Sequence, residues 1–183
     1  MNHLKFITLL CAAATIISCT DDTVAKHTEY AAGQLKILVN ECDPSDTETL
    51  LPRSLSNEGE LLYTTPQGWT SGFFPGSLWY VYEFTGDEAV KAEAIKYTEL
   101  LNPIREYTGT HDLGFMMNCS YGNALRLSPA DTIPAVLVET ADNLCSRFDE
   151  GVGCIRSWDF GHWNFPVIID NMMNLDLLFS ASK

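Results

Sequence analysis

Apolar residues recur with the period of an α-helix along most of this chain. Ala31, Leu35 and Leu38, for example, fall on one face of a helix predicted over residues 24–40. Similar stripes predict five more helices: one over 75–86, one that Asp87 caps and Pro103 ends, and others over about 114–127, from 128 or 131 to about 148, and over about 167–181. No segment of useful length alternates between apolar and polar residues as a strand does. The pattern therefore predicts an all-α fold.

The connections between these helices alternate between short and long. Residues 43–66 are polar and rich in turn-forming residues, which predicts a long loop, and residues 151–158 predict a loop or a short extended piece. Such connections predict helical hairpins stacked side by side. The last predicted helix runs almost to Lys183, with nothing after it to cover its apolar face. We therefore expect the isolated chain to be unstable, aggregated or molten.

The N-terminal segment has the features of a targeting signal. Lys5 precedes an apolar stretch over 6–17, which is too short to span a membrane as a mature helix. Residues 16–19 (IISC) resemble the bacterial lipobox, in which the cysteine is acylated and becomes the new N-terminus. We therefore predict a lipoprotein signal peptide over residues 1–18 and a mature domain over residues 19–183. An ordinary secretory signal with an incidental cysteine is the alternative.

The resemblance to a lipobox implies a place in the bacterial cell envelope. A lipid on Cys19 would anchor the chain to a membrane, either in the periplasm or at the outer-membrane surface. The acidic residues Asp21 and Asp22 follow closely. They resemble an export signal of surface lipoproteins, which favours the outer surface.

The chain is strongly acidic, with a formal net charge of −13 at pH 7. This charge repels the phosphates of nucleic acids, so we expect no nucleic-acid partner. An anionic sugar would also be repelled at long range and would need local positive groups. Arg126, Arg147 and Arg156 are candidates for that role, although each also fits a helix end or a surface charge.

The cysteines do not form a metal-binding pattern. Cys42, Cys119, Cys145 and Cys154 show neither a CxxC motif nor a Cys/His spacing, so no metal site is predicted. Cys119 and Cys145 lie in apolar helical segments and are expected to be core thiols. A disulfide between Cys42 and another cysteine stays open for a protein of the cell envelope.

Two carboxylates stand out because each lies alone in an apolar, aromatic segment. Asp112 lies in residues 111–117 (HDLGFMM) and Asp170 in residues 165–175 (FPVIIDNMMNL). A buried carboxylate is costly unless another group uses or satisfies it. The pair therefore indicates an acid/base site. A helix cap is the alternative for Asp112, and a solvated place in a first helical turn is the alternative for Asp170.

Several longer motifs occur in order along the chain: residues 69–79 (WTSGFFPGSLW), 111–115 (HDLGF), 120–124 (SYGNA), 156–158 (RSW) and 169–174 (IDNMMN). Together they resemble the unsaturated glucuronyl hydrolases of glycoside hydrolase family 88. This resemblance implies an (α/α)6 barrel of twelve helices, of which the predicted helices match the N-terminal half. It also implies that the C-terminal half, which supplies several sugar-binding residues in the family, is missing from this chain.

The resemblance implies a hydrolase that removes a terminal 4,5-unsaturated uronic acid from oligosaccharides made by polysaccharide lyases, such as glycosaminoglycan fragments. It implies no cofactor and no metal. By position in the motifs, Asp170 is the general acid and base, and Asp112 is a second essential carboxylate that orients substrate and stabilises positive charge. Four flanking apolar side chains are expected to keep water from Asp170 and favour its protonated form, namely those of Ile168, Ile169, Met172 and Met173.

Aromatic and amide side chains complete the predicted site. Trp69 resembles the aromatic wall of the family's sugar site, because the C–H face of a sugar packs well on an indole. Core packing is the alternative for Trp69, and Trp158 is a second candidate platform. Asn174 lies one helical turn after Asp170, so we predict that it hydrogen-bonds Asp170 and contributes to substrate binding. His111 is expected to be structural.

Two classes of function stay open at this point. One is an enzyme of this family, inactive or incomplete as this chain alone. The other is a non-catalytic surface lipoprotein that binds glycans, or a remnant of the enzyme. Among enzymes, the unsaturated rhamnogalacturonyl hydrolases share fold and chemistry, but the motifs HDLGF and IDNMMN favour the glucuronyl group. The motifs do not specify the polysaccharide, its linkage and sulfation, or the oligomeric state.

Overall fold

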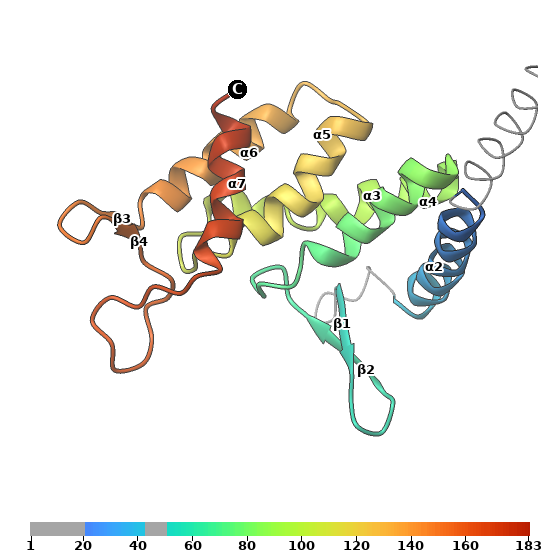
Figure 1. Ribbon diagram of the computed structural model, residues 1–183, viewed down its shortest axis with the longest axis horizontal. Helices are drawn as coiled ribbons and strands as arrows, with labels where there is room; N and C mark the ends of the chain where they lie inside the picture. Colours follow the sequence, from blue (N-terminus) through green and yellow to red (C-terminus); the bar gives the residue numbers. More distant parts are fainter. Residues whose placement is uncertain (1–20, 43–50) are drawn as a thin grey trace, which may run out of the picture.

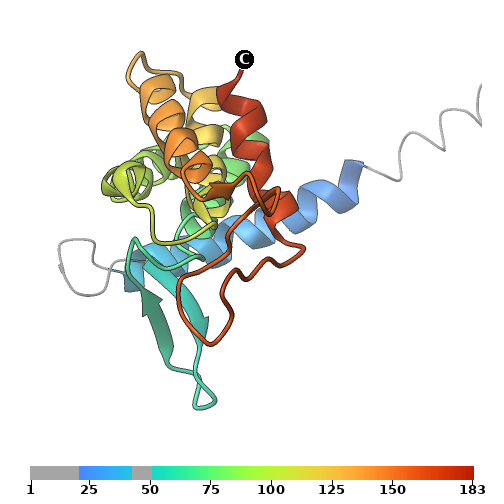
Figure 2. The same cartoon turned by 90° about the vertical axis from the view of Figure 1, so that its left-hand side faces the viewer.

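The computed structural model describes residues 21–42 and 51–183, and this part of the chain is mostly helical (Figures 1 and 2). Its helices are α2 (Asp21–Glu41), α3 (Phe73–Thr85), α4 (Glu88–Glu99), the 3-10 helix η1 (Asn102–Glu106), the π-helix η2 (Gly114–Gly122), α5 (Asn123–Leu127), α6 (Ile133–Cys145) and α7 (Asn171–Ala181). Two antiparallel hairpins accompany them: β1 (Leu51–Leu55) with β2 (Leu61–Thr64), and β3 (Phe148–Asp149) with β4 (Cys154–Ile155). The predicted signal peptide and Cys19 lie outside the described residues.

The helix ends follow the predicted signals in most places. Asp87 caps α4, since its side chain accepts a hydrogen bond from the backbone N–H of Ala89 at 2.9 Å. Gly86 ends α3 with a φ of 66°, a left-handed conformation that favours glycine. Pro103 does not end α4 directly. It lies in the first turn of η1, where a backbone N–H has no partner within the helix. The missing N–H of proline therefore costs no hydrogen bond there.

The prediction of one long loop over 43–66 is wrong, because β1 and β2 form a hairpin within it. The turn of the hairpin contains Gly59 with a φ of 86°. Figures 1 and 2 show this hairpin projecting from the helices. Of the nine residues in β1 and β2, only Leu51 is buried in the core. The apolar alternation that reveals a half-buried strand is therefore absent, and the sequence signal failed for that reason.

The prediction of a single α-helix over 114–127 also needs correction. The segment begins as the π-helix η2 and continues as α5. A π-helix is wider than an α-helix and shifts the register of the side chains that follow it. Gly72 faces the start of η2, and a Cβ atom built on it would lie 2.2 Å from the carbonyl oxygen of Phe115. The backbones of these segments therefore approach each other as closely as glycine allows.

The core forms where α3 packs against α4 and η2. Trp79 is fully buried, and its indole N–H donates a hydrogen bond to the hydroxyl of Thr98 on α4 at 2.9 Å. The ring of Phe74 lies edge-on to that of Tyr97, with 4.8 Å between the ring centroids. Fully burying a large apolar side chain stabilises a fold by about 1.5–3 kcal/mol. These aromatic contacts therefore hold the first helical hairpin, α3–α4, together.

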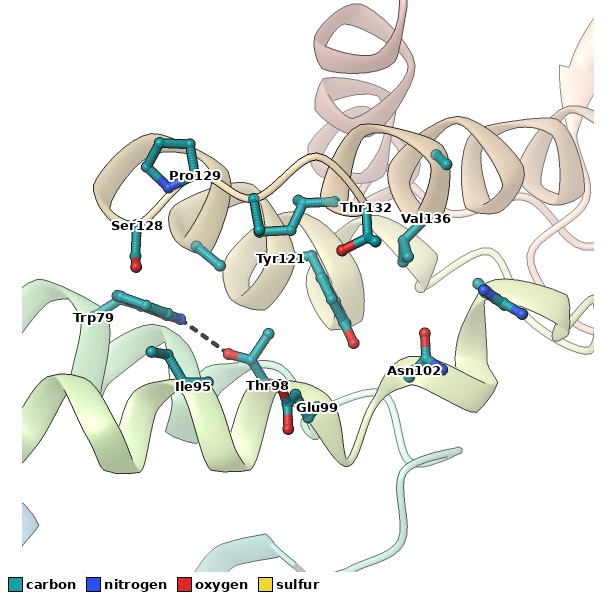
Figure 3. Close-up of a pocket in the computed structure, with 15 residues that line it drawn as sticks. Trp79, Ile95, Thr98, Glu99, Asn102, Tyr121, Ser128, Pro129, Thr132 and Val136 are labelled. Atoms are coloured by element: carbon teal, nitrogen blue, oxygen red, sulfur yellow. Dashed lines mark hydrogen bonds between the residues drawn. The ribbon is translucent and has the colours of Figure 1, made fainter.

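A cavity of about 710 Å³ lies between α3, α4, η1, η2 and α6. Figure 3 shows that its walls include Trp79, Thr98 and Tyr121. Burial raises the pKa of Tyr121 to about 12, so this phenol stays neutral at physiological pH. None of the predicted site residues lines this cavity. It therefore does not belong to the predicted acid/base site.

The cysteine predictions are partly corrected. Cys42, Cys119, Cys145 and Cys154 are all free thiols. Cys42 is buried, and burial raises the pKa of its thiol and that of Cys119. Cys145 is exposed rather than in the core, because it is the last residue of α6.

Within the described ranges, no helix combines the length and the apolar character needed to cross a membrane.

Gly114 lies where η2 meets α7, so a substitution there tests how closely these two helices pack. A Cβ atom at this position would lie 2.6 Å from the Cα atom of Asn174. We expect Gly114→Ala to reduce the free energy of unfolding by about 1–3 kcal/mol, because neither backbone can move without repacking. Urea denaturation followed by circular dichroism measures this change.

Gly33→Ala is the matched control, because Gly33 lies inside α2 with nothing within 4 Å of an added Cβ atom. It should stabilise the helix by up to about 1 kcal/mol. Equal effects of the two substitutions would contradict the proposed close packing.

Candidate active site

Asp112 lies in the connection that leads into η2, and its side chain is 16% exposed. Its Oδ2 atom accepts a hydrogen bond from the hydroxyl of Thr110 at 2.7 Å. Leu113 occupies the cap position of η2, and in this part of the chain no backbone N–H of the helix bonds the carboxylate of Asp112. The helix-cap alternative is therefore not what the structure contains.

Asp170 is the residue just before α7, and its side chain is 38% exposed. It occupies the place of a helix cap, but its side chain makes no capping hydrogen bond. Its Oδ1 atom is buried and has no hydrogen-bond partner. The carboxyl group therefore has one atom turned inward and one side open to solvent, which suits a group that acts on a bound substrate.

His111 brings the two carboxylates together. The ring is almost fully buried, and its Nε2 atom lies 3.3 Å from Oδ1 of Asp112 and 3.8 Å from Oδ1 of Asp170. One side-chain atom from each of the three residues lies within 4.8 Å of the others. Residues 58 positions apart in the sequence thus form one compact group, as expected for a pair of acids acting at one reacting centre.

A second hydrogen bond fixes the histidine ring. Nδ1 of His111 lies 2.8 Å from Oδ1 of Asn171, the first residue of α7. The amide group of Asn171 is itself held, because its Nδ2 atom donates to the backbone carbonyl of Ile155 at 2.7 Å. The start of α7 and the strand β4 therefore hold His111 in one orientation.

The expected apolar shield around Asp170 is wrong. Ile169 is 87% exposed, and Met172 and Met173 are each 64% exposed. Met172 and Met173 lie on the exposed side of the first turn of α7, whereas Asn171 and Asn174 are buried. Ile169 lies just before the helix. On its inward side Asp170 faces His111, whose Nε2 atom lies 3.8 Å from Oδ1 of Asp170.

An aromatic cluster lies beside this group. Trp69, Phe73 and Phe115 meet edge-on, with ring centroids 5.7 to 6.1 Å apart. Trp69 is 48% exposed, so it is not purely a core residue. Phe115 follows Asp112 by three residues in the same motif, which places the cluster near the acids. An exposed indole in this position offers a surface on which a sugar ring can pack.

Trp158 contacts the histidine of the group directly. Its ring contacts that of His111 edge-on with 6.3 Å between centroids, and it stacks on Phe160 at 5.5 Å. Trp163 meets the same ring edge-on at 6.3 Å. Phe160 and Trp163 are both exposed. The loop between β4 and α7 therefore carries an aromatic surface outward from the acids.

Asn174 is fully buried, and its amide bonds backbone groups rather than a carboxylate. Its Oδ1 atom accepts from the N–H of Phe115 at 3.0 Å, and its Nδ2 atom lies 3.4 Å from the carbonyl oxygen of Asp170. The predicted hydrogen bond from Asn174 to Asp170 is therefore present, but it reaches the backbone carbonyl of Asp170 and not its carboxyl group. Asn174 ties the first turn of η2 to the first turn of α7.

The arginines proposed to attract an anionic sugar are engaged in ion pairs. Arg126 pairs with Glu83, and both Arg147 and Arg156 pair with Asp159. The hydrogen bond from Arg147 keeps the pKa of Asp159 below its usual range. The interpretation of these arginines as structural or surface charges thus agrees with their contacts.

The chain matches known proteins and solved structures, although no family model matches it. The chain is 47% identical over 136 residues to the unsaturated glucuronyl hydrolase of Formosa agariphila, an alignment that covers 72% of this chain and 34% of that protein. It is 31% identical over 137 residues to the unsaturated chondroitin disaccharide hydrolase of Streptococcus pyogenes serotype M1, again covering 72% and 34%. A crystal structure of an unsaturated glucuronyl hydrolase specific for heparin matches with a TM-score of 0.83 and 47% identity, covering 88% of this chain and 43% of that one.

The chain is related to the unsaturated glucuronyl hydrolases. The resemblance predicted from the motifs is confirmed, and so is the all-α class of helical barrel, apart from the short hairpins. The chain spans about a third of the length of the curated relatives that it matches, at 34% of each.

Sequence reasoning missed two residues that shape this site. His111 was expected to be structural, yet it is the group that contacts both acids. Asn171 was not singled out at all. One signal for Asn171 was available: in the motif IDNMMN the two asparagines are three residues apart, so a helix places both on one face.

The bond from Phe115 to Asn174 is a buried polar contact, and its loss should be costly. We expect Asn174→Ala to reduce the free energy of unfolding by about 1–3 kcal/mol, because the N–H of Phe115 keeps no acceptor. Asn118→Ala is the control, since Asn118 bonds the exposed Asp176 of α7 at 2.6 Å. It should change stability by about 0.5 kcal/mol or less. If the two variants melted at the same temperature, the hydrogen bond from Phe115 to Asn174 would not stabilise the contact between η2 and α7.

Proposed function

We propose that this chain carries the acid/base centre of a hydrolase that removes a terminal 4,5-unsaturated uronic acid from oligosaccharides. The observation that carries the proposal is the group of His111, Asp112 and Asp170, with side-chain atoms within 4.8 Å of one another. The kinship with unsaturated glucuronyl hydrolases supports it independently. The proposal applies to the whole protein that contains these residues.

The reaction is the hydration of a vinyl ether. Asp170 in its acid form gives its proton to C4 of the unsaturated ring, and the electron pair of the C4=C5 bond forms the new C–H bond. Positive charge then develops on C5 and the ring oxygen. The carboxylate of Asp112 stabilises this charge across a short distance.

Water completes the addition. It attacks C5 while Asp170, now a carboxylate, takes one proton from the water, so Asp170 ends in its original form. The product is a hemiketal at C5. It opens and releases the rest of the oligosaccharide without displacement at the anomeric carbon, which separates this reaction from the usual two-carboxylate glycosidases.

Trp69 and Trp158 are proposed to bind the sugar from two sides. Trp69 is 48% exposed, and Trp158 extends outward through Phe160 and Trp163. Glycosaminoglycan fragments are the proposed substrate class, because the relatives include a chondroitin disaccharide hydrolase and a heparin-specific enzyme. A non-catalytic glycan-binding lipoprotein or an enzyme remnant would use the same aromatic surface without turnover. An unsaturated rhamnogalacturonyl hydrolase would differ in substrate alone.

The coding DNA beyond the codon of Lys183 gives a first test. An open frame that continues into a second set of hairpin helices supports a complete enzyme. A stop codon there supports the remnant, in which the site is retained without the remainder of the barrel.

Asp170→Asn in the whole protein tests the assignment of the acid. The amide keeps the size of the side chain but cannot cycle a proton, so turnover should fall by a factor on the order of 10²–10⁴ with little change in substrate binding. Loss of the ultraviolet absorbance of the double bond in unsaturated chondroitin and heparin disaccharides measures turnover. Asp112→Asn should also slow turnover.

Asp176→Asn is the matched control, because Asp176 lies on the same helix and its carboxylate bonds only Asn118 among the described residues. It should leave turnover unchanged. Wild-type turnover in Asp170→Asn would show that Asp170 is structural and that the assigned mechanism is wrong.

The cellular location is part of this proposal. Residues 16–19 resemble a lipobox, so Cys19 is proposed to carry a lipid that anchors the protein in the cell envelope. Cys19→Ala should abolish lipidation and release the protein from membranes, as measured by mass spectrometry and fractionation. An unmodified N-terminus at another cleavage site in the wild type would contradict this location.

A further inference from the structure

The orientation of Asn171 determines which nitrogen of His111 carries a proton. Nδ2 of Asn171 donates to the carbonyl of Ile155 at 2.7 Å, so its Oδ1 atom is the one that faces His111. An amide oxygen can only accept a hydrogen bond. Nδ1 of His111, at 2.8 Å from this oxygen, must therefore be the donor. His111 and Asn171 are both buried, so water does not replace this partner.

This assignment leaves Nε2 of His111 facing two acids. The distances to Oδ1 of Asp112 and Oδ1 of Asp170 are 3.3 and 3.8 Å. With a bare Nε2 and two ionised carboxylates, a lone pair would face two negative charges in a buried place. Within residues 21–42 and 51–183, neither acid forms an ion pair with a lysine or an arginine. Since none of the described residues supplies a positive charge at this place, a proton on one of the three groups would relieve the repulsion.

We propose that His111, Asp112 and Asp170 share one proton, and that Asn171 is the positioning residue that keeps it there. The proton lies either on Nε2 or on the carboxyl oxygen that faces it. The three side chains hold the same number of protons in both forms. Thr110 donates to the other oxygen of Asp112 at 2.7 Å, so that oxygen already has a hydrogen-bond donor. The buried Oδ1 of Asp170, which lacks a hydrogen-bond partner, is the atom that gains most from the proton.

The catalytic consequence rests on the proposed function. A shared proton lets Asp170 begin the reaction as an acid, although its apolar neighbours on α7 are exposed and do not shield it. If Nδ1 lost its acceptor, His111 would carry its single ring proton on Nε2 and donate it to two ionised acids. The group would then hold one proton fewer, and Asp170 would lose its acid form at a lower pH.

Two variants of Asn171 separate positioning from structural support. Asn171→Asp keeps an oxygen for Nδ1 and loses the donor to Ile155. Asn171→Leu loses both, so the two variants share the loss of the bond to Ile155. The readout is nitrogen-15 NMR of the histidine rings, which distinguishes a protonated from a bare ring nitrogen and needs no enzyme activity.

In the wild type and in Asn171→Asp, Nδ1 of His111 should stay protonated and Nε2 should show a proton or a strong hydrogen bond. In Asn171→Leu the form with bare Nδ1 should appear. His27 and His162 are exposed and serve as internal references. A bare Nδ1 in the wild type, or unchanged His111 signals in Asn171→Leu, would overturn the proposal. A shift of these signals on adding Zn²⁺ or Mg²⁺ would also overturn it, because a cation would then occupy the place of the proton.

The pH profile of the whole enzyme gives a second measurement if a variant folds poorly under NMR conditions. Asn171→Leu should move the loss of kcat at high pH to a lower pH, with kcat at neutral pH falling on the order of tenfold and KM nearly constant. Asn171→Asp should restore the profile. Equal profiles for the two variants would refute a positioning role. A complete absence of turnover in the wild type would refute the proposed function but leave the NMR result standing.

Discussion

The close packing of η2 against α7 is the constraint on which the site depends. Gly114 allows the backbones to approach so closely that any side chain there would overlap Asn174. Asn174 then accepts from the N–H of Phe115, and Asn171 fixes His111, so two asparagines one turn apart bind the start of one helix to the start of the other. Asp112 lies just before η2 and Asp170 just before α7, so both acids lie beside this contact. Their separation is therefore set by backbone contact rather than by long, adaptable side chains.

This arrangement explains how two acids can lie together without a counter-charge. Each acid is held at a helix start by its own backbone, and His111 lies between them. The chain is strongly acidic, but salt screens the interactions between distant charges. The charge on the two acids therefore depends mainly on the protons held by the site itself. The site is thus built around one histidine whose ring cannot turn, and both carboxylates respond to the same ring nitrogen.

The apolar residues that surround the site have a different arrangement from the one that the sequence implied. Ile169, Met172 and Met173 are exposed on the outer side of α7, and Phe179 is exposed further along the same helix. Contiguous exposed apolar side chains of this kind mark surfaces that bind ligands or other protein segments. Trp69 is half exposed and Trp158 contacts His111 beside the exposed rings of Phe160 and Trp163, so the aromatic surfaces available to a sugar come from the segments before α3 and α7 and not from α7.

The sequence by itself determined the helices, the cap at Asp87, the glycine at the end of α3 and the importance of both acids. These features depend on local signals, namely a period of 3.6 residues, capping side chains and carboxylates in apolar segments. It did not determine the hairpin β1–β2, whose strands bury too little to show alternation, or the π-helix, which packs closely against Gly72 and α7. The roles of His111 and Asn171 were decided by tertiary structure alone. Their partners lie 60 residues apart in the chain, and only the folded chain brings a histidine nitrogen, an amide and two carboxylates into one group.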